Sequence, residues 1–204
     1  MSENSAGATP RIFTIGHSNH EPEAFAALLE RHGIEVIADV RSQPYSAYAQ
    51  HFSKGHIETF LRERHIKYVF LGDVLGGRPE GEEFYDDAQH VLYDRVAESE
   101  PFRQGIEQLL EGIGAHAVAL LCGEEDPAGC HRRLLVGRVL RERGVDVVHI
   151  RGDGRVQSED EISRGEEFQR TQGQMALFET EETEAWRSTR SVSQRKGPPS
   201  SSTP

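Results

Sequence analysis

The sequence predicts an α/β protein: a three-layer sandwich with a mostly parallel five-stranded sheet, followed by a largely disordered C-terminal tail. Five short apolar runs alternate with segments of helical periodicity, which is the pattern of a parallel sheet covered by helices on both faces. The run IEVIADV is nearly continuously apolar, as expected of a strand that is buried on both sides. The length of 204 residues fits one domain with a tail.

The predicted elements begin at Arg11. The strands are RIFTI (11–15), IEVIADV (34–40), IKYVFL (66–71), AHAVALLC (115–122) and VDVVHI (145–150). Pro22 occupies the first turn of a helix in which apolar residues recur at helical spacing until Gly33 ends it. Further helices are predicted at 56–65, 83–98, 101–113 and 126–144.

The composition divides the chain into three parts. We expect residues 1–10 to form a flexible lead-in, residues 11–156 to form the α/β domain, and residues 157–204 to form a tail of low order. The tail has hardly any apolar periodicity, so it cannot bury enough apolar surface to offset the entropy cost of ordering it. Two islands interrupt it, QMALF at 174–178 and AWRSTRSV at 185–192, and Trp186 would pin the second onto the domain.

The charge and the cysteine count exclude several classes of protein. The sequence has 23 Lys and Arg against 34 Asp and Glu, a net charge of −11, which argues against non-specific binding of duplex DNA. No segment approaches the roughly 18 apolar residues of a membrane span, and the polar N-terminus lacks the apolar region of a secretory signal. Two cysteines cannot form a disulfide framework. We therefore expect a cytoplasmic protein with reduced thiols and no membrane contact.

Side chains able to do chemistry follow the predicted strands. They are Gly16, His17 and Ser18 after the first strand, Asp39 and Arg41 at the second, and Cys122, Cys130, His131 and Arg132 around the fourth. Because ligands bind at the carboxyl ends of the strands in open parallel sheets, we expect these residues to surround one cavity. Arg41 and Arg132 would hold negative charge there, so the predicted ligand is a small anionic or nucleotide-like molecule.

The two cysteines are separated by seven residues, which is neither a CxxC nor a zinc-finger spacing. Cys130 lies in the first turn of a predicted helix, where the helix dipole and Arg132 would lower a thiol pKa. We interpret Cys122 and Cys130 as candidate nucleophiles or, with His131, as candidate metal ligands, and His17 or His131 as the general acid or base. The alternative is a pair of buried structural thiols.

Three further patterns either leave two interpretations open or argue against a function. Asp39 and Arg41 are two residues apart on a strand, so they face the same side, either as an ion pair that supports the backbone or with Arg41 binding an anion. The arginine of a Cys-x5-Arg phosphatase loop would fall at Val136 or Ala128, which disfavours that chemistry. The GGR loop has no nucleotide-binding fingerprint.

The ordered motifs TIGHSN, ADVRSQP, LGGR and LLCGEEDPAGCHR resemble DUF488, a bacterial and archaeal family of unknown function, over roughly residues 11–154. In that family the motifs converge on one pocket. The resemblance therefore implies a shared site lined by Gly16, His17, Ser18, Asp39, Arg41, Cys122, Cys130, His131 and Arg132. It supplies no reaction, so the enzymatic activity that we expect from the cysteine and histidine residues has no assigned class.

The tail island QMALF resembles the short QL[SD]LF peptide through which bacterial polymerases and repair proteins dock on the DNA sliding clamp. Gln174, Leu177 and Phe178 match that peptide, and Met175 replaces its leucine. An apolar peptide in a disordered tail suits docking into a preformed groove. It supports an alternative function, a non-catalytic binding module recruited to DNA replication or repair, unless the segment folds back on the domain.

Overall fold

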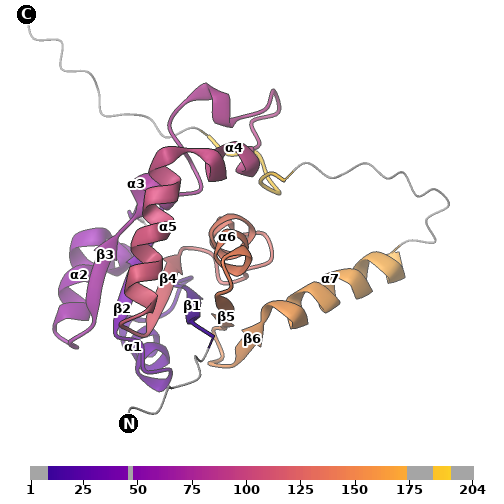
Figure 1. Cartoon of the computed structure of the whole chain (residues 1–204). Coiled ribbons are helices and arrows are strands. Elements are labelled where there is room, and N and C mark those ends of the chain that lie inside the picture. The colour runs from indigo at the N-terminus through magenta and orange to yellow at the C-terminus, as the bar shows by residue number, and fades with distance from the viewer. Residues whose placement is uncertain (1–8, 46–47, 174–185, 194–204) are drawn as a thin grey trace, which may run out of the picture.

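The structure is a computed structural model that describes residues 9–45, 48–173 and 186–193. Within these residues a six-stranded, mostly parallel sheet has the order β3-β2-β4-β1-β5-β6, with helices on both faces (Figure 1). The strands are β1 (Arg11–Gly16), β2 (Val36–Asp39), β3 (Lys67–Phe70), β4 (Val118–Cys122), β5 (Asp146–Ile150) and β6 (Val156–Ser158). The predicted α/β class is confirmed.

The helices fall into two groups that bury opposite faces of the sheet. They are α1 (Pro22–Arg31), α2 (Lys54–Arg62), α3 (Gly72–Leu75), α4 (Tyr93–Glu98), α5 (Glu100–Ile113), α6 (Arg138–Glu142) and α7 (Glu159–Gly173), with 3-10 turns η1 (Gln50–Phe52) and η2 (Glu82–Phe84) and a π-helical stretch η3 (Arg132–Gly137). In β4, Val118 and Leu120 join an apolar cluster with α5, whereas Ala119 and Leu121 join one with α1 and α2. Because β4 is buried on both faces, its sequence VALLC is continuously apolar. None of the described helices is long and apolar enough to cross a membrane.

The strand order brings three chemically important strand ends together. β4 lies between β2 and β1, and all three are parallel. Cys122 is in register with Gly16 of β1, and Asp39 of β2 is in register with Leu121. The residues that follow β1, β2 and β4 therefore lie at one edge of the sheet.

Three details of the prediction are wrong. The helix predicted at 83–98 is limited to α4, because Tyr85 and Val91 form an antiparallel bridge in place of a helical turn. The helix predicted from residue 126 begins only at His131, because residues 123–129 form a loop. The predicted five strands are one too few, since β6 pairs with β5 in antiparallel orientation.

The region predicted to have low order from residue 157 contains the end of β6 and all of α7, which runs outward from the sheet edge (Figure 1). Polar contacts attach α7 to the domain: Glu159 and Glu166 both pair with Arg133, at 2.8 and 2.7 Å. Ile162 is its buried apolar anchor. Because α7 is attached mainly by ion pairs, its sequence has little apolar periodicity, and the sequence therefore did not predict this helix. The QMALF motif at 174–178 lies outside the described residues.

Segment 186–193 returns to the domain beside α4 (Figure 1). The indole Nε1 of Trp186 donates a hydrogen bond to the Leu134 carbonyl at 2.7 Å, and Arg138 stacks over the ring at 4.2 Å. The backbone N–H of Ser188 donates to Val91 at 2.9 Å, and its hydroxyl accepts from the Val91 N–H. We call these eight residues the C-terminal segment.

Candidate thiol site

A cavity of about 550 Å³ opens where β1, β2 and β4 end. Four of the predicted site residues line it: His17 after β1, Arg41 after β2, Cys122 at the end of β4, and His131 at the start of the following helix. The other walls come from the loop after β3, from Tyr93 of α4 and from residues 188–192 of the C-terminal segment. The volume lies in the range of small-molecule sites.

The two cysteines are free thiols that contact each other. Their sulfur atoms are 3.2 Å apart, with the thiol of Cys130 donating to the sulfur of Cys122. Cys122 lines the cavity, whereas Cys130 is 1% exposed and lies behind it. The fold therefore presents one sulfur to a ligand and keeps the second in contact with the first.

His131 completes this group. Its Nδ1 lies 3.8 Å from the sulfur of Cys122 and 3.9 Å from that of Cys130. Its Nε2 contacts the carbonyl oxygen of Val40 at 2.9 Å, and a carbonyl can only accept, so Nε2 carries the proton and Nδ1 faces the sulfurs. Gly77 packs against the ring, because a Cβ there would lie 2.7 Å from Cγ of His131.

The electrostatics of the group distinguish the two thiols. The hydrogen bond from Cys130 lowers the pKa of Cys122 well below its ordinary value, and the positive charge of His131 and Arg132 acts in the same direction against the effect of burial. Burial and the neighbouring Cys122 sulfur raise the pKa of Cys130. Burial is the largest single influence on the pKa of His131 and lowers it, but the charge of Cys122 and the hydrogen bonds with Cys122 and Val40 together raise that pKa. Of the two thiols, Cys122 is therefore the one that loses its proton more readily.

The same three residues are a set of metal donors. One ligand atom from each of Cys122, Cys130 and His131 lies within 4.8 Å of the others, and sulfur with imidazole nitrogen suits zinc or another soft ion. The Nε2 contact with Val40 would orient the ring for such a role. The donor set therefore fits either metal binding or thiol chemistry.

His17 is held with one ring nitrogen toward the cavity side. Its Nδ1 donates to the Ser18 carbonyl at 2.9 Å, which leaves Nε2 as an acceptor, and its ring stacks on Phe52 at 4.5 Å. Burial is the main reason that its pKa is lowered. A neutral imidazole with a free acceptor nitrogen can take a proton from a bound ligand. Ser18 does not line the cavity; its backbone N–H donates to the Gly123 carbonyl.

Asp39 does not reach the cavity, contrary to our expectation. It is fully buried, and it accepts hydrogen bonds from Nε and Nη2 of Arg41 at 2.9 and 2.6 Å and from the hydroxyl of Tyr68 at 2.7 Å. Arg41 also donates through Nη1 to the carbonyl of Phe52. The ion-pair alternative is therefore the one that the structure contains, although the Arg41 side chain still forms part of the cavity wall.

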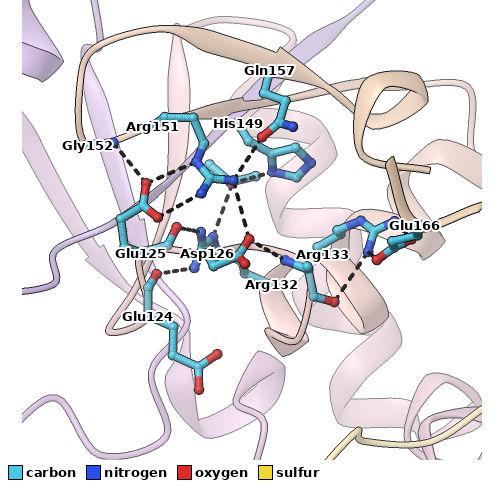
Figure 2. A network of polar contacts seen from close by, with 12 residues as sticks. Glu124, Glu125, Asp126, Arg132, Arg133, His149, Arg151, Gly152, Gln157 and Glu166 are labelled. Atoms are coloured by element: carbon cyan, nitrogen blue, oxygen red, sulfur yellow. Dashed lines mark hydrogen bonds and ion pairs between the residues drawn. The ribbon is translucent and has the colours of Figure 1, made fainter. Parts of the chain in front are cut away.

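Arg132, which we expected to hold ligand charge, is also absent from the cavity wall. It is fully buried and donates to Thr14 Oγ1 and to the carbonyl oxygens of Glu124 and Glu125. Figure 2 shows Arg132 and Arg151 converging on this loop between the cysteines, with Arg151 paired to the Glu125 carboxylate at 2.8 Å. Gly16 has a structural role too, because any Cβ there would collide with the Glu124 carbonyl.

The positive charge of the cavity has other sources. Arg78 from the loop after β3 and Arg190 from the C-terminal segment line it with Arg41, against one acidic side chain, Glu124. In the described part of the chain, neither the Arg78 nor the Arg190 guanidinium has a hydrogen-bond or ion-pair partner. Neither arginine was among the predicted site residues, although Arg78 belongs to the LGGR motif. The only signal toward Arg190 was the island around Trp186.

Fold and site together define an α/β domain with a histidine-flanked thiol pair at the carboxyl ends of its parallel strands. The family described as "Domain of unknown function DUF488" matches residues 21–139. This match covers more than half of the chain, and the protein therefore belongs to the DUF488 family. No curated protein and no solved structure matches it. β1 with His17, and the C-terminal segment with Arg190, lie outside the matched residues.

Proposed function

We propose that this protein is a thiol-dependent enzyme that binds a small anionic or nucleotide-like molecule in the Cys122 cavity. The observation that carries the proposal is that the only sulfur on the described cavity wall belongs to the thiol that accepts a hydrogen bond from a second cysteine. A thiolate is the reactive form of cysteine, and a donor thiol beside it stabilises its negative charge.

The ligand class follows from the charges around that sulfur. Three arginines and one glutamate line the cavity, so the field there favours negative charge although the whole chain carries −11. The unpaired guanidinium groups of Arg78 and Arg190 can bind a carboxylate or phosphate through two hydrogen bonds each. Arg41 adds charge from the back of the cavity while it stays bound to Asp39.

The remaining residues have supporting roles in this proposal. His17 presents an acceptor nitrogen for proton transfer to or from the ligand. His131 is a positioning residue for the two sulfurs, and its ring is held between Gly77 and the Val40 carbonyl. Arg132 and Arg151 hold the loop that joins the two cysteines.

The experiment compares two alkylating reagents that differ in charge. Iodoacetate is an anion and iodoacetamide is neutral, and the adduct on Cys122 is quantified by mass spectrometry. We expect the iodoacetate-to-iodoacetamide rate ratio to exceed that of a free cysteine peptide by about tenfold, because the cavity concentrates anions. Arg78→Gln and Arg190→Gln should each lower the ratio, and Arg62→Gln, at an exposed position of α2, should leave it unchanged. A ratio equal to that of the free peptide would contradict the anionic ligand.

A further inference from the structure

The two thiols differ in access although their sulfurs are in contact. Cys122 lines the cavity, and Cys130 is 1% exposed behind it. A ligand can reach only the first sulfur, whereas the second can reach anything that becomes bonded to the first. This is the arrangement that thiol–disulfide exchange requires, an attacking thiolate and a resolving thiol at its back.

We propose that Cys122 and Cys130 form a reversible disulfide during turnover and that the substrate is a small anionic compound containing a sulfur–sulfur bond. This inference rests on the proposed function, because it takes the same cavity and the same nucleophile. It adds a reaction class, thiol–disulfide exchange, and a role for Cys130.

The steps balance without any further oxidant. The Cys122 thiolate attacks one sulfur of the substrate R–S–S–R′, so a Cys122–S–R bond forms, the substrate S–S bond breaks, and R′–S⁻ leaves. Once Cys122 is no longer a thiolate, His131 gives its Nδ1 proton to the departing R′–S⁻. The neutral Nδ1 then accepts the proton of Cys130, which attacks the Cys122 sulfur and releases R–S⁻. The protein dithiol has been oxidised to a disulfide, and the substrate disulfide has been reduced to two thiols. An external dithiol restores the reduced protein by the reverse exchange.

The geometry needs only a small movement for the second step. The sulfur atoms are 3.2 Å apart, so forming a bond of about 2.05 Å requires an approach of about 1.2 Å. His131 lies at nearly equal distances from both sulfurs, so its Nδ1 can accept the Cys130 proton without reorienting. The joining loop contains Gly123 and Gly129 at its two ends, where rotation of the backbone meets least steric resistance.

The test uses 5,5′-dithiobis(2-nitrobenzoate), an anionic aromatic disulfide whose released thiolate is coloured. The chain has two cysteines and no other thiols to react. The reduced wild type should release two equivalents of thiolate and finish without an adduct, having lost two hydrogens by mass. Cys130→Ser should release one equivalent and retain one adduct, and Cys122→Ser should release almost none at the same time point. Cys130→Ala replaces Cys130→Ser if the hydroxyl prevents folding.

Three outcomes would overturn the inference: a wild type that keeps one or two adducts, equal behaviour of wild type and Cys130→Ser, or a stoichiometric zinc ion that blocks the reaction until it is chelated. These outcomes are separate from failure of the proposed function. If the iodoacetate-to-iodoacetamide ratio is raised as expected but the wild type keeps a stable adduct, the proposed function stands and only the resolving role of Cys130 is contradicted. The rate of disulfide formation with each reagent is divided by the rate of that reagent with a free thiol. If this relative rate is the same for the neutral 2,2′-dithiodipyridine as for the anionic reagent, the inference that the substrate is anionic is contradicted.

Discussion

Glu159 is the residue whose replacement tests how α7 is attached to the domain. Its carboxylate is 10% exposed and pairs with Nε of Arg133 at 2.8 Å, with Arg141 at 3.2 Å and with Nε2 of His149 at 3.1 Å. Arg133 and His149 are themselves buried. Glu159→Ala would leave a buried guanidinium with fewer partners and a buried imidazole nitrogen with none of its present bonds.

The expected loss follows from these contacts. Removing one partner of a buried ion pair costs about 3 kcal/mol or more, because the other charge stays in the interior. Losing the hydrogen bond to His149 adds about 1 kcal/mol. Arg133 keeps Glu166 as a partner at 2.7 Å, which offsets part of this loss. We therefore expect Glu159→Ala to lower the free energy of unfolding by about 3 kcal/mol.

Glu166→Ala is the matched control, because it removes a carboxylate of the same helix from the same arginine. The Glu166 side chain is 39% exposed, so its pair is screened by solvent and should contribute about 0.5 kcal/mol. Urea denaturation of wild type and both variants at neutral pH measures the two losses. Equal losses, or a loss for Glu159→Ala below about 1 kcal/mol, would refute the reasoning that burial of this pair fixes α7.

Three further outcomes are expected. Burial lowers the pKa of His149 from 6.5, so folding favours the neutral ring and stability should fall as the pH drops below 6.5; His149→Gln should remove this part of the decline in urea titrations at several pH values. Gly77→Ala should displace the His131 ring from its position beside the two sulfurs and change the rate of Cys122 alkylation several-fold, whereas Gly55→Ala, with open space for the Cβ, should leave that rate unchanged. A tail peptide containing QMALF should bind a bacterial sliding clamp in fluorescence polarisation. The double substitution Leu177→Ala and Phe178→Ala should abolish this binding without lowering the melting temperature of the whole chain. A loss of several kcal/mol of stability would instead place both residues in a packed core and contradict the docking role.

The parts of the fold that could be predicted from the sequence are those encoded by local apolar patterns. Strands β1 to β5 coincide with the predicted apolar runs. β2 and β4 are buried along their whole length, as expected of inner parallel strands, whereas the edge strand β3 is only partly buried. The meeting of His17, Cys122 and His131 at one edge followed from the rule for parallel sheets. That rule needs only the direction of the strands and gives only the common edge. The grouping of these residues around one cavity depends on the strand order, which the sequence did not predict.

The parts that could not be predicted depend on polar contacts between distant residues. α7 is attached through Arg133, which is 26 and 33 positions away from its two glutamates. The C-terminal segment is attached through the indole of Trp186, which bonds to Leu134, and through hydrogen bonds with Val91 and Tyr93, more than 90 positions earlier in the chain. Neither attachment produces a periodic pattern, so composition suggested low order for both regions, and only Trp186 indicated a contact with the domain.

The arginines show why residue type near a motif does not establish a role at the site. Arg132 directly follows His131 in the sequence, yet three oxygen acceptors, including two backbone carbonyls, surround its guanidinium and keep it in the scaffold. Arg78 and Arg190 belong to no cysteine or histidine motif, yet they line the cavity with donors that no described acceptor uses. What separates the two cases is the number of acceptors that the fold places within reach of each guanidinium. That number is set by loops and chain ends, the elements for which a single sequence carries the least information.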